Sequence, residues 1–183
     1  MSTLLRQGKA RRWRVLLAAV VSVVAALGVA AAPAAAALPL SRNYSLESFN
    51  FPGHFARHRN SLGELTTVSS QLDRDDATWL LVPGLAGAGV SLRSKNYPSF
   101  YLRHSGFRLQ ISQSDGSRLY REDATFYVRG GNASSGSGWI SLESYNFPGR
   151  YIRHADYHLW LHPDDGSRLF AEDSTWAARP PLA

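Results

Sequence analysis

The sequence of 183 residues contains no cysteine. A chain without cysteine forms no disulfide bonds, so packing alone must hold its fold together and a small disulfide-stabilised scaffold is excluded. Long hydrophobic runs are also lacking after residue 40. Because a helix needs about twenty apolar residues to cross a bilayer, we expect no membrane contact from this part of the chain.

A basic surplus is lacking as well, although the net charge of +6 suggests one. Five basic residues and no acidic residue precede Leu40, so the rest of the chain has 15 basic against 14 acidic residues. A nucleic-acid-binding protein presents a basic face that neutralises phosphates, and this nearly neutral body does not indicate one. We expect no nucleic-acid partner.

The first forty residues have the layout of a secretory signal. Basic residues come first, an apolar stretch follows at 15–29, and small-residue cleavage sites lie at 30–32 and 34–36. We predict a signal peptide over residues 1–37 and a secreted, extracellular protein. Arg11 and Arg12 are compatible with twin-arginine export, and retention as a membrane anchor is the alternative.

Two motifs occur three times in the remaining chain. The longer motif reads SLESFNFPGHFARH at 45–58, SLRSKNYPSFYLRH at 91–104 and SLESYNFPGRYIRH at 141–154. The shorter motif reads DATW at 76–79, DATF at 123–126 and DSTW at 173–176. Both recur in step, which indicates a true triplication within one domain over residues 41–183, with repeats at about 41–86, 87–136 and 137–183.

Each repeat shows short runs in which apolar and polar residues alternate, the pattern of half-buried strands. The Asn-Phe-Pro-Gly segments at 50–53 and 146–149 predict type II turns, and the Asp-Gly pairs at 115–116 and 165–166 predict turns that close hairpins. About four strands per repeat favour an all-β fold, and a β-trefoil with three pseudo-symmetric repeats is the expected architecture. A three-bladed propeller is the alternative.

The motifs SLESYNFPGRYIRH at 141–154 and DGSRLFAEDSTW at 165–176 resemble the arabinose-binding domain of α-L-arabinofuranosidases of the AbfB type. The resemblance covers residues 45–183. It implies a β-trefoil carbohydrate-binding module that recognises arabinofuranose side chains of hemicellulose, with one pocket per repeat. The catalytic domain that usually accompanies this module is not expected in the chain.

The resemblance also implies the sugar contacts. They comprise a histidine that ends each long motif, an aspartate that opens each short motif, an aromatic residue three positions after the histidine, and an aromatic residue from the Asn-aromatic-Pro turn of the neighbouring repeat. The implied residues are His58, Asp76 and Tyr97 in the first pocket, His104, Asp123, Phe107 and Phe147 in the second, and His154, Asp173, Tyr157 and Phe51 in the third. The first repeat departs from the pattern, with Ser61 in place of the first aromatic residue.

This set of residues suits a sugar independently of the resemblance. A carboxylate accepts hydrogen bonds from two hydroxyl groups, an imidazole supplies a third polar contact, and an aromatic ring covers the apolar face of a furanose. The alternative is that these residues only complete strand ends and turns, repeated because the fold repeats. Packing usually selects apolar residues at such positions, which favours the functional interpretation.

Two further interpretations compete with sugar binding. Glycosidases use a pair of carboxylates, but Glu122 and Asp123 are neighbours that would point to opposite faces of a strand, and three similar sites do not fit an enzyme that needs one. His154, His158 and His162 have helical metal-site spacing, but on a strand they would be too far apart for one ion. We expect no catalytic residue, no metal and no cofactor.

The sequence therefore predicts a secreted, monomeric carbohydrate-binding protein whose partner is an arabinofuranose-bearing polysaccharide such as arabinoxylan or arabinan. An α-L-arabinofuranosidase and a protein-binding domain of the same fold are the alternatives.

Overall fold

The computed structural model describes residues 38–134 and 136–183. Strands dominate this part of the chain, and the predicted all-β class is confirmed. The first repeat contains β1 (Arg42–Ser48), β2 (Phe55–Arg59), β3 (Leu62–Thr66), α1 (Gln71–Asp76) and β4 (Trp79–Pro83). The second contains β5 (Val90–Ser94), β6 (Phe100–Ser105), β7 (Arg108–Gln113), α2 (Arg118–Asp123) and β8 (Phe126–Gly130). The third contains β9 (Trp139–Ser144), β10 (Arg150–Ala155), β11 (His158–Pro163), α3 (Arg168–Asp173) and β12 (Trp176–Arg179).

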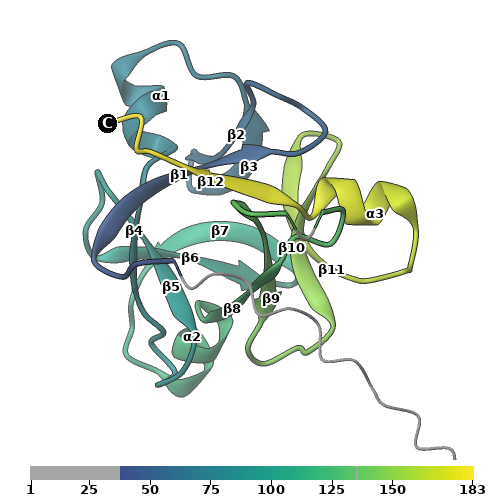
Figure 1. The fold of residues 1–183 in the computed structure, drawn as a ribbon. Coiled ribbons are helices and arrows are strands. Elements are labelled where there is room, and N and C mark those ends of the chain that lie inside the picture. Colours follow the sequence, from purple (N-terminus) through teal and green to yellow (C-terminus); the bar gives the residue numbers. More distant parts are fainter. Residues whose placement is uncertain (1–37, 135) are drawn as a thin grey trace, which may run out of the picture. The chain divides into compact units, whose positions relative to one another are not determined.

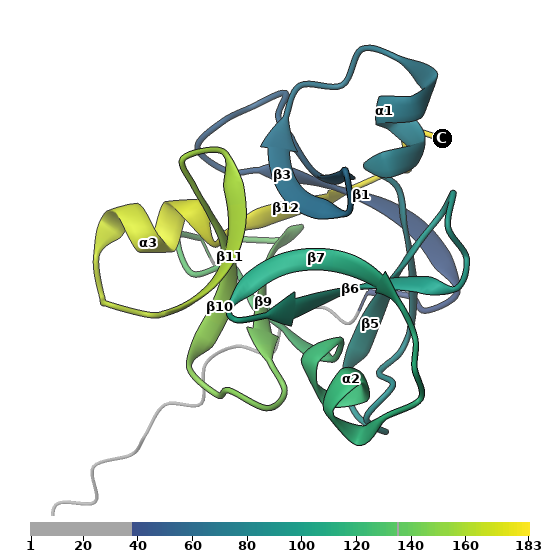
Figure 2. The same cartoon turned by 180° about the vertical axis from the view of Figure 1, so that it is seen from behind.

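The twelve strands form one continuous antiparallel sheet that closes on itself. The first and last strands of the repeats pair around a ring in the order β1, β4, β5, β8, β9, β12 and back to β1. The hairpins β2–β3, β6–β7 and β10–β11 extend from this ring and meet one another through β3, β7 and β11. Each repeat contains one helix, and Figures 1 and 2 show α1, α2 and α3 outside the sheet.

This sheet corrects the expected fold class. The prediction of a β-trefoil is wrong, because the strands join in a single closed antiparallel β-barrel. Separate propeller blades are not formed either, since one sheet contains all twelve strands. The repeat pattern indicates how many strands there are, but closure depends on pairs such as β1 with β12, which lie at opposite ends of the domain.

Six apolar residues that recur in the two motifs belong to the core inside this sheet. Each of the six is at most 3% exposed: Leu46, Leu92, Leu142, Trp79, Phe126 and Trp176. Burial of such a side chain contributes roughly 1.5 to 3 kcal/mol. Both tryptophans also satisfy their indole nitrogens, since Trp79 Nε1 donates to the Ala56 carbonyl oxygen at 3.0 Å and Trp176 Nε1 donates to that of Ile152 at 3.2 Å.

The Asn-aromatic-Pro segments turn as predicted in the first and third repeats. The His54 amide donates to the Phe51 carbonyl oxygen at 3.0 Å, and Gly53 takes a φ of 80° that suits glycine. The Asp-Gly pairs do not close hairpins, contrary to prediction. Gly116 and Gly166 lie in the loops that lead from β7 into α2 and from β11 into α3.

The three short helices were not expected, and each begins at a serine cap. The hydroxyl oxygens of Ser70, Ser117 and Ser167 accept hydrogen bonds from the amides three residues later. Such caps compensate for unpaired amides in the first turn.

Within the described residues, no helix is long and apolar enough to cross a membrane. The predicted signal peptide at 1–37 lies outside the described residues.

Candidate functional site

Each repeat brings its predicted histidine and aspartate together. The histidines lie on β2, β6 and β10, and the aspartates are the last residues of α1, α2 and α3. Histidine Nε2 lies 3.5 Å from the aspartate Oδ1 in the pair His58–Asp76, 3.3 Å in His104–Asp123 and 3.5 Å in His154–Asp173. All six side chains are buried, so each pair is a polar cluster at the edge of the core.

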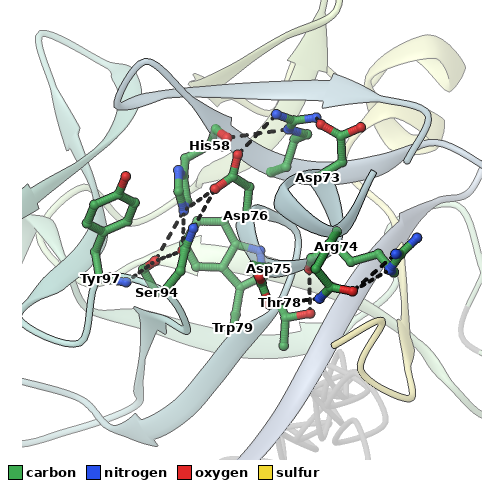
Figure 3. Close-up of polar contacts among 12 residues, drawn as sticks. His58, Asp73, Arg74, Asp75, Asp76, Thr78, Trp79, Ser94 and Tyr97 are labelled. Atoms are coloured by element: carbon green, nitrogen blue, oxygen red, sulfur yellow. Dashed lines mark hydrogen bonds and ion pairs between the residues drawn. The ribbon is translucent and has the colours of Figure 1, made fainter. Parts of the chain in front are cut away.

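An asparagine from the next repeat joins each pair, and sequence reasoning missed it. Figure 3 shows His58 and Asp76 side by side in the first repeat. Asn96 Nδ2 donates to Asp76 Oδ1 at 2.7 Å, while its Oδ1 lies 3.1 Å from His58 Nε2. Asn146 does the same for Asp123 and His104, and Asn50 for Asp173 and His154. The signal was present, because this asparagine occurs in all three copies of the long motif.

The asparagine also fixes the form of the histidine ring. Since the amide nitrogen of the asparagine faces the carboxylate, its oxygen accepts a hydrogen bond from Nε2–H, which leaves Nδ1 as the acceptor of a neutral imidazole. Burial lowers the pKa of His58 and of His154, and the nearby aspartate offsets this effect only in part. Both rings are therefore neutral at pH 7.

An arginine one position before each histidine holds the second carboxylate oxygen. Arg57, Arg103 and Arg153 donate through Nη2 to the aspartate Oδ2 at 3.0, 2.7 and 2.6 Å. Sequence reasoning also missed these arginines, although the Arg-His pair ends every long motif. The carboxylate thus accepts from asparagine on one oxygen and from arginine on the other. About two of its roughly four acceptor positions are left for a ligand.

The aromatic residues of the neighbouring turn lie against the histidines. Ring centroids are 5.6 Å apart for Tyr97 and His58, 5.3 Å for Phe147 and His104, and 5.2 Å for Phe51 and His154. Each candidate site therefore lies at a boundary between two repeats, which we call a seam. The first seam contains His58 and Asp76, the second His104 and Asp123, and the third His154 and Asp173. The third seam joins the third repeat to the first, because Asn50 and Phe51 come from the start of the domain.

The second predicted aromatic residue lies at the tip of a hairpin. Phe107 stacks on His104 with ring centroids 6.1 Å apart, and Tyr157 lies 5.7 Å from Phe51. Their φ angles of 64° and 60° are in the left-handed region, which bulky residues adopt at a cost of about 1 to 3 kcal/mol. Ser61 occupies the matching position in the first repeat with a φ of 66°. An aromatic residue kept in a strained turn is typical of a functional site.

Cavities adjoin the first two seams. A cavity of about 420 Å³ is lined by residues that include His58, Asp76 and Tyr97, and one of about 280 Å³ by residues that include His104, Asp123, Phe107 and Phe147. A leucine from the helix lines each, Leu72 in the first and Leu119 in the second. Leu169 occupies the matching position in the third repeat. The exposed fractions are 60% for Leu72, 63% for Leu119 and 61% for Leu169, and these exposed leucines were not identified from the sequence.

The remaining predicted histidines lie elsewhere. His158 begins β11 and its Nδ1 lies 3.3 Å from Arg108 Nη2, while His162 stacks on Trp160 with centroids 5.7 Å apart. Three or more histidine or acidic side chains in a metal-binding arrangement do not occur in the described part of the chain.

Glu122 and Asp123 point in different directions, as expected, but they lie at the end of helix α2 and not on a strand. Glu122 Oε1 accepts from Arg118 at the protein surface, 2.7 Å away, while Asp123 is buried at the seam.

Comparison with known proteins identifies the domain. Residues 44–178 match the family model of the Alpha-L-arabinofuranosidase B (ABFB) domain. The probable alpha-L-arabinofuranosidase B of Aspergillus clavatus is 36% identical over 74 residues, which are 40% of this chain and 15% of that relative. The arabinofuranosidase/B-xylosidase of Trichoderma koningii is 34% identical over 97 residues, 49% of this chain and 19% of that relative. The matches thus span less than a fifth of either relative.

Solved structures agree with this assignment. A crystal structure of an arabinofuranosidase complexed with arabinofuranosyl-alpha-1,2-xylobiose superimposes with a TM-score of 0.73 and 25% identity, covering 81% of this chain and 33% of that one. The cytolethal distending toxin of Actinobacillus actinomycetemcomitans, with a TM-score of 0.61 and 16% identity, shares the fold alone. The resemblance noted in the sequence is confirmed, and the chain belongs to the alpha-L-arabinofuranosidase B domain family.

Proposed function

We propose that this protein is a non-catalytic carbohydrate-binding module that recognises α-L-arabinofuranose side chains of polysaccharides such as arabinoxylan and arabinan. The observation that carries the proposal is the recurrence, at all three seams, of a histidine and an aspartate beside an aromatic ring from the next repeat. The family and the relatives named as arabinofuranosidases support this choice of sugar.

The chemistry of the second seam suits a neutral furanose. Asp123 is held by Asn146 and Arg103 in one orientation, so its remaining acceptor positions are directed without a ligand having to order them. A sugar hydroxyl donates to that carboxylate, and a second hydroxyl donates to the imidazole Nδ1 of His104. The rings of Phe107 and Phe147, with centroids 5.2 Å apart, cover the apolar face of the sugar.

The carboxylates favour binding over catalysis. A glycosidase places two carboxyl groups about 5 to 9.5 Å apart on either side of the scissile bond, one of them free to transfer a proton. Asp123 already accepts hydrogen bonds on both oxygens, and its neighbour Glu122 is paired with Arg118 at the surface. Because the matches span under a fifth of the arabinofuranosidases, hydrolysis by this chain is the outcome against which binding is tested.

Retention on insoluble polysaccharide tests the proposal. The full chain should bind arabinoxylan, fail to bind xylan from which arabinose has been removed, and release no arabinose on prolonged incubation. Phe147→Ala should weaken binding at the second seam by roughly tenfold, while Leu40→Ala, an exposed apolar residue that lines neither cavity, should not. Equal binding to both xylans, or arabinose release, would overturn the proposal, and binding to neither would favour a protein partner.

We also propose that the protein acts outside the cell, where such polysaccharides occur, as a monomer. Support comes from the signal-like pattern of residues 1–37. N-terminal sequencing of protein recovered from the medium of the producing cells tests the location, and a mature chain that remains inside would contradict it.

A further inference from the structure

The first seam differs from the other two in a coordinated way. At the hairpin tip it has Ser61 where the others have Phe107 and Tyr157. In the third position of the helix it has Asp73, where the others have the buried aromatic residues Tyr120 and Phe170. Two aromatic residues of the other repeats are thus replaced by small or charged polar ones in the first repeat.

The aspartate changes the role of the neighbouring arginine. In the second and third repeats the guanidinium carbon lies over the aromatic ring of the helix, at 5.1 Å for Arg103 on Tyr120 and 5.6 Å for Arg153 on Phe170. In the first repeat Arg57 instead pairs with Asp73 through Nη1 and with Asp76 through Nη2 (Figure 3). Its side chain is 5% exposed, against 16% for Arg103.

The serine changes the size and the walls of the cavity. The first cavity, at about 420 Å³, has one and a half times the volume of the second, at about 280 Å³. Ser61 and Asn60 line it where the second has Phe107 and Gly106. It also reaches Phe100 and Ile111 on the hairpin of the second repeat, so it extends beyond the His58–Asp76 pair.

We propose that the first pocket binds arabinofuranose together with the sugar to which it is linked, whereas the second binds a single arabinofuranose. The inference rests on the proposed function. The larger volume leaves room for a second ring. Side chains of Asn60, Ser61 and Arg59 offer donors and acceptors to its hydroxyls, in place of the aromatic wall that closes the second pocket around one ring.

Residue-resolved NMR titration of the unmodified protein reads each pocket separately. The probes are the backbone amides of the hairpin tips at 60–61 and 106–107. The ligands are methyl α-L-arabinofuranoside and an arabinofuranosyl xylobiose. We expect the amides of the first tip to report at least tenfold tighter binding of the oligosaccharide than of the monosaccharide, and those of the second to report less than a threefold difference.

Substitution of Ser61 provides the matched pair of variants. Its φ of 66° is close to the 64° of Phe107 and the 60° of Tyr157, so the turn accommodates an aromatic residue. Ser61→Tyr should tighten monosaccharide binding at the first tip and abolish the oligosaccharide preference there. Ser61→Ala, which leaves the space open, should retain the preference.

The outcomes separate this inference from the proposed function. If the second tip responds to arabinofuranose and the first tip shows no oligosaccharide preference, only the inference is overturned. If neither tip responds to either ligand, the proposed function fails and the inference fails with it. A Ser61→Tyr protein that does not fold leaves the titration of the unmodified protein to decide.

Discussion

Asn146 serves both polar groups of the second seam, since it donates to Asp123 and accepts from His104. Arg103 occupies the other carboxylate oxygen. At each seam the buried aspartate is therefore part of the structure as well as a candidate sugar contact. Replacement of this aspartate is expected to affect both folding and binding, whereas replacement of the exposed Phe147 is expected to affect binding alone.

Asp173→Asn tests the structural part of this dual role. We expect the free energy of unfolding to fall by about 1.5 to 3 kcal/mol, because a neutral amide cannot replace the charge-assisted bond from Arg153. Denaturant unfolding at pH 7 measures the change. Asp156→Asn, in the exposed hairpin tip, is the control and should have little effect. Equal stability of both variants would show that the buried network contributes nothing.

Acidification tests the buried histidines. Burial lowers the pKa of His58 and His154 in the folded protein, so both rings stay neutral at pH values just below 6.5, where the same rings in the unfolded chain already bind protons. Their contribution to stability is therefore complete above about pH 6.5 and is lost as the pH falls towards the lowered pKa values. Burial also lowers the pKa of His162. The facing charges oppose one another: aspartates 76 and 173 raise the two pKa values, and Arg57, Arg153 and His54 lower them.

The expected result is an unfolding free energy that is constant between pH 8 and 7 and falls below pH 6.5, by at most about 1.4 kcal/mol per pH unit for each histidine. Urea unfolding at stepped pH measures it, and NMR shifts of the imidazole protons assign it to particular rings. Stability that rises between pH 7 and 5 would contradict the burial of neutral histidines.

At the scale of elements, the short helices connect local capping to the sites. Each helix has six residues, begins after a serine cap and ends with the aspartate of a seam. Such a helix is too short to be stable by itself, so its caps and its packing determine whether the aspartate is held in place. The cap at one end thus supports a candidate sugar contact at the other.

Ser117→Ala tests this connection in the second repeat. Loss of the hydrogen bond from the Tyr120 amide, 3.0 Å long, should cost about 1 kcal/mol of stability and weaken sugar binding at the second seam. Ser114→Ala, an exposed loop serine, is the matched control. Melting curves and titration of the 106–107 amides measure the two effects. A stability loss with unchanged binding would separate the cap from the site.

Some of these elements could be predicted from the sequence and others could not. Alternating residues in the repeats predicted the strands, and the family resemblance implied the histidine-aspartate pairs, whose members recur in the two motifs in register. The helices were missed because six residues hold less than two turns, too few to show helical periodicity. Asn96 was missed because its role is a contact with residues 20 and 38 positions away, which no local pattern records.

At the scale of the whole molecule, closure of the sheet joins the two ends of the domain. β1 pairs with β12, and β9 pairs with both β8 and β12. The pairing of barrel strands therefore depends on all three repeats, which the repeat length alone does not reveal. The expected β-trefoil was wrong for this reason, since periodicity specifies neither the partners of a strand nor how a sheet closes.

Truncation after Arg129 tests the cooperativity of the closed sheet. The shortened chain lacks β9 to β12, so β1 and β8 each lose a partner strand and the core cluster loses third-repeat residues such as Ile152 and Trp176. We expect no cooperative thermal transition by circular dichroism, whereas the full chain should unfold in one step. A cooperative melt of residues 41–129 would mean that the repeats fold independently.

The position of the sites at the seams has a consequence for descent. Every repeat supplies a histidine and an aspartate to one candidate site and an asparagine and an aromatic ring to the site of the preceding repeat, so a single repeat contains two halves of different sites and no complete one. An ancestral chain of one repeat could bind a ligand in this way only as a ring of three copies. In a chain of three fused copies each copy can differ, and a change in the asparagine segment of one copy affects the site of the preceding copy. The replacements in the first repeat concern the hairpin tip and the helix, the parts that serve one site alone.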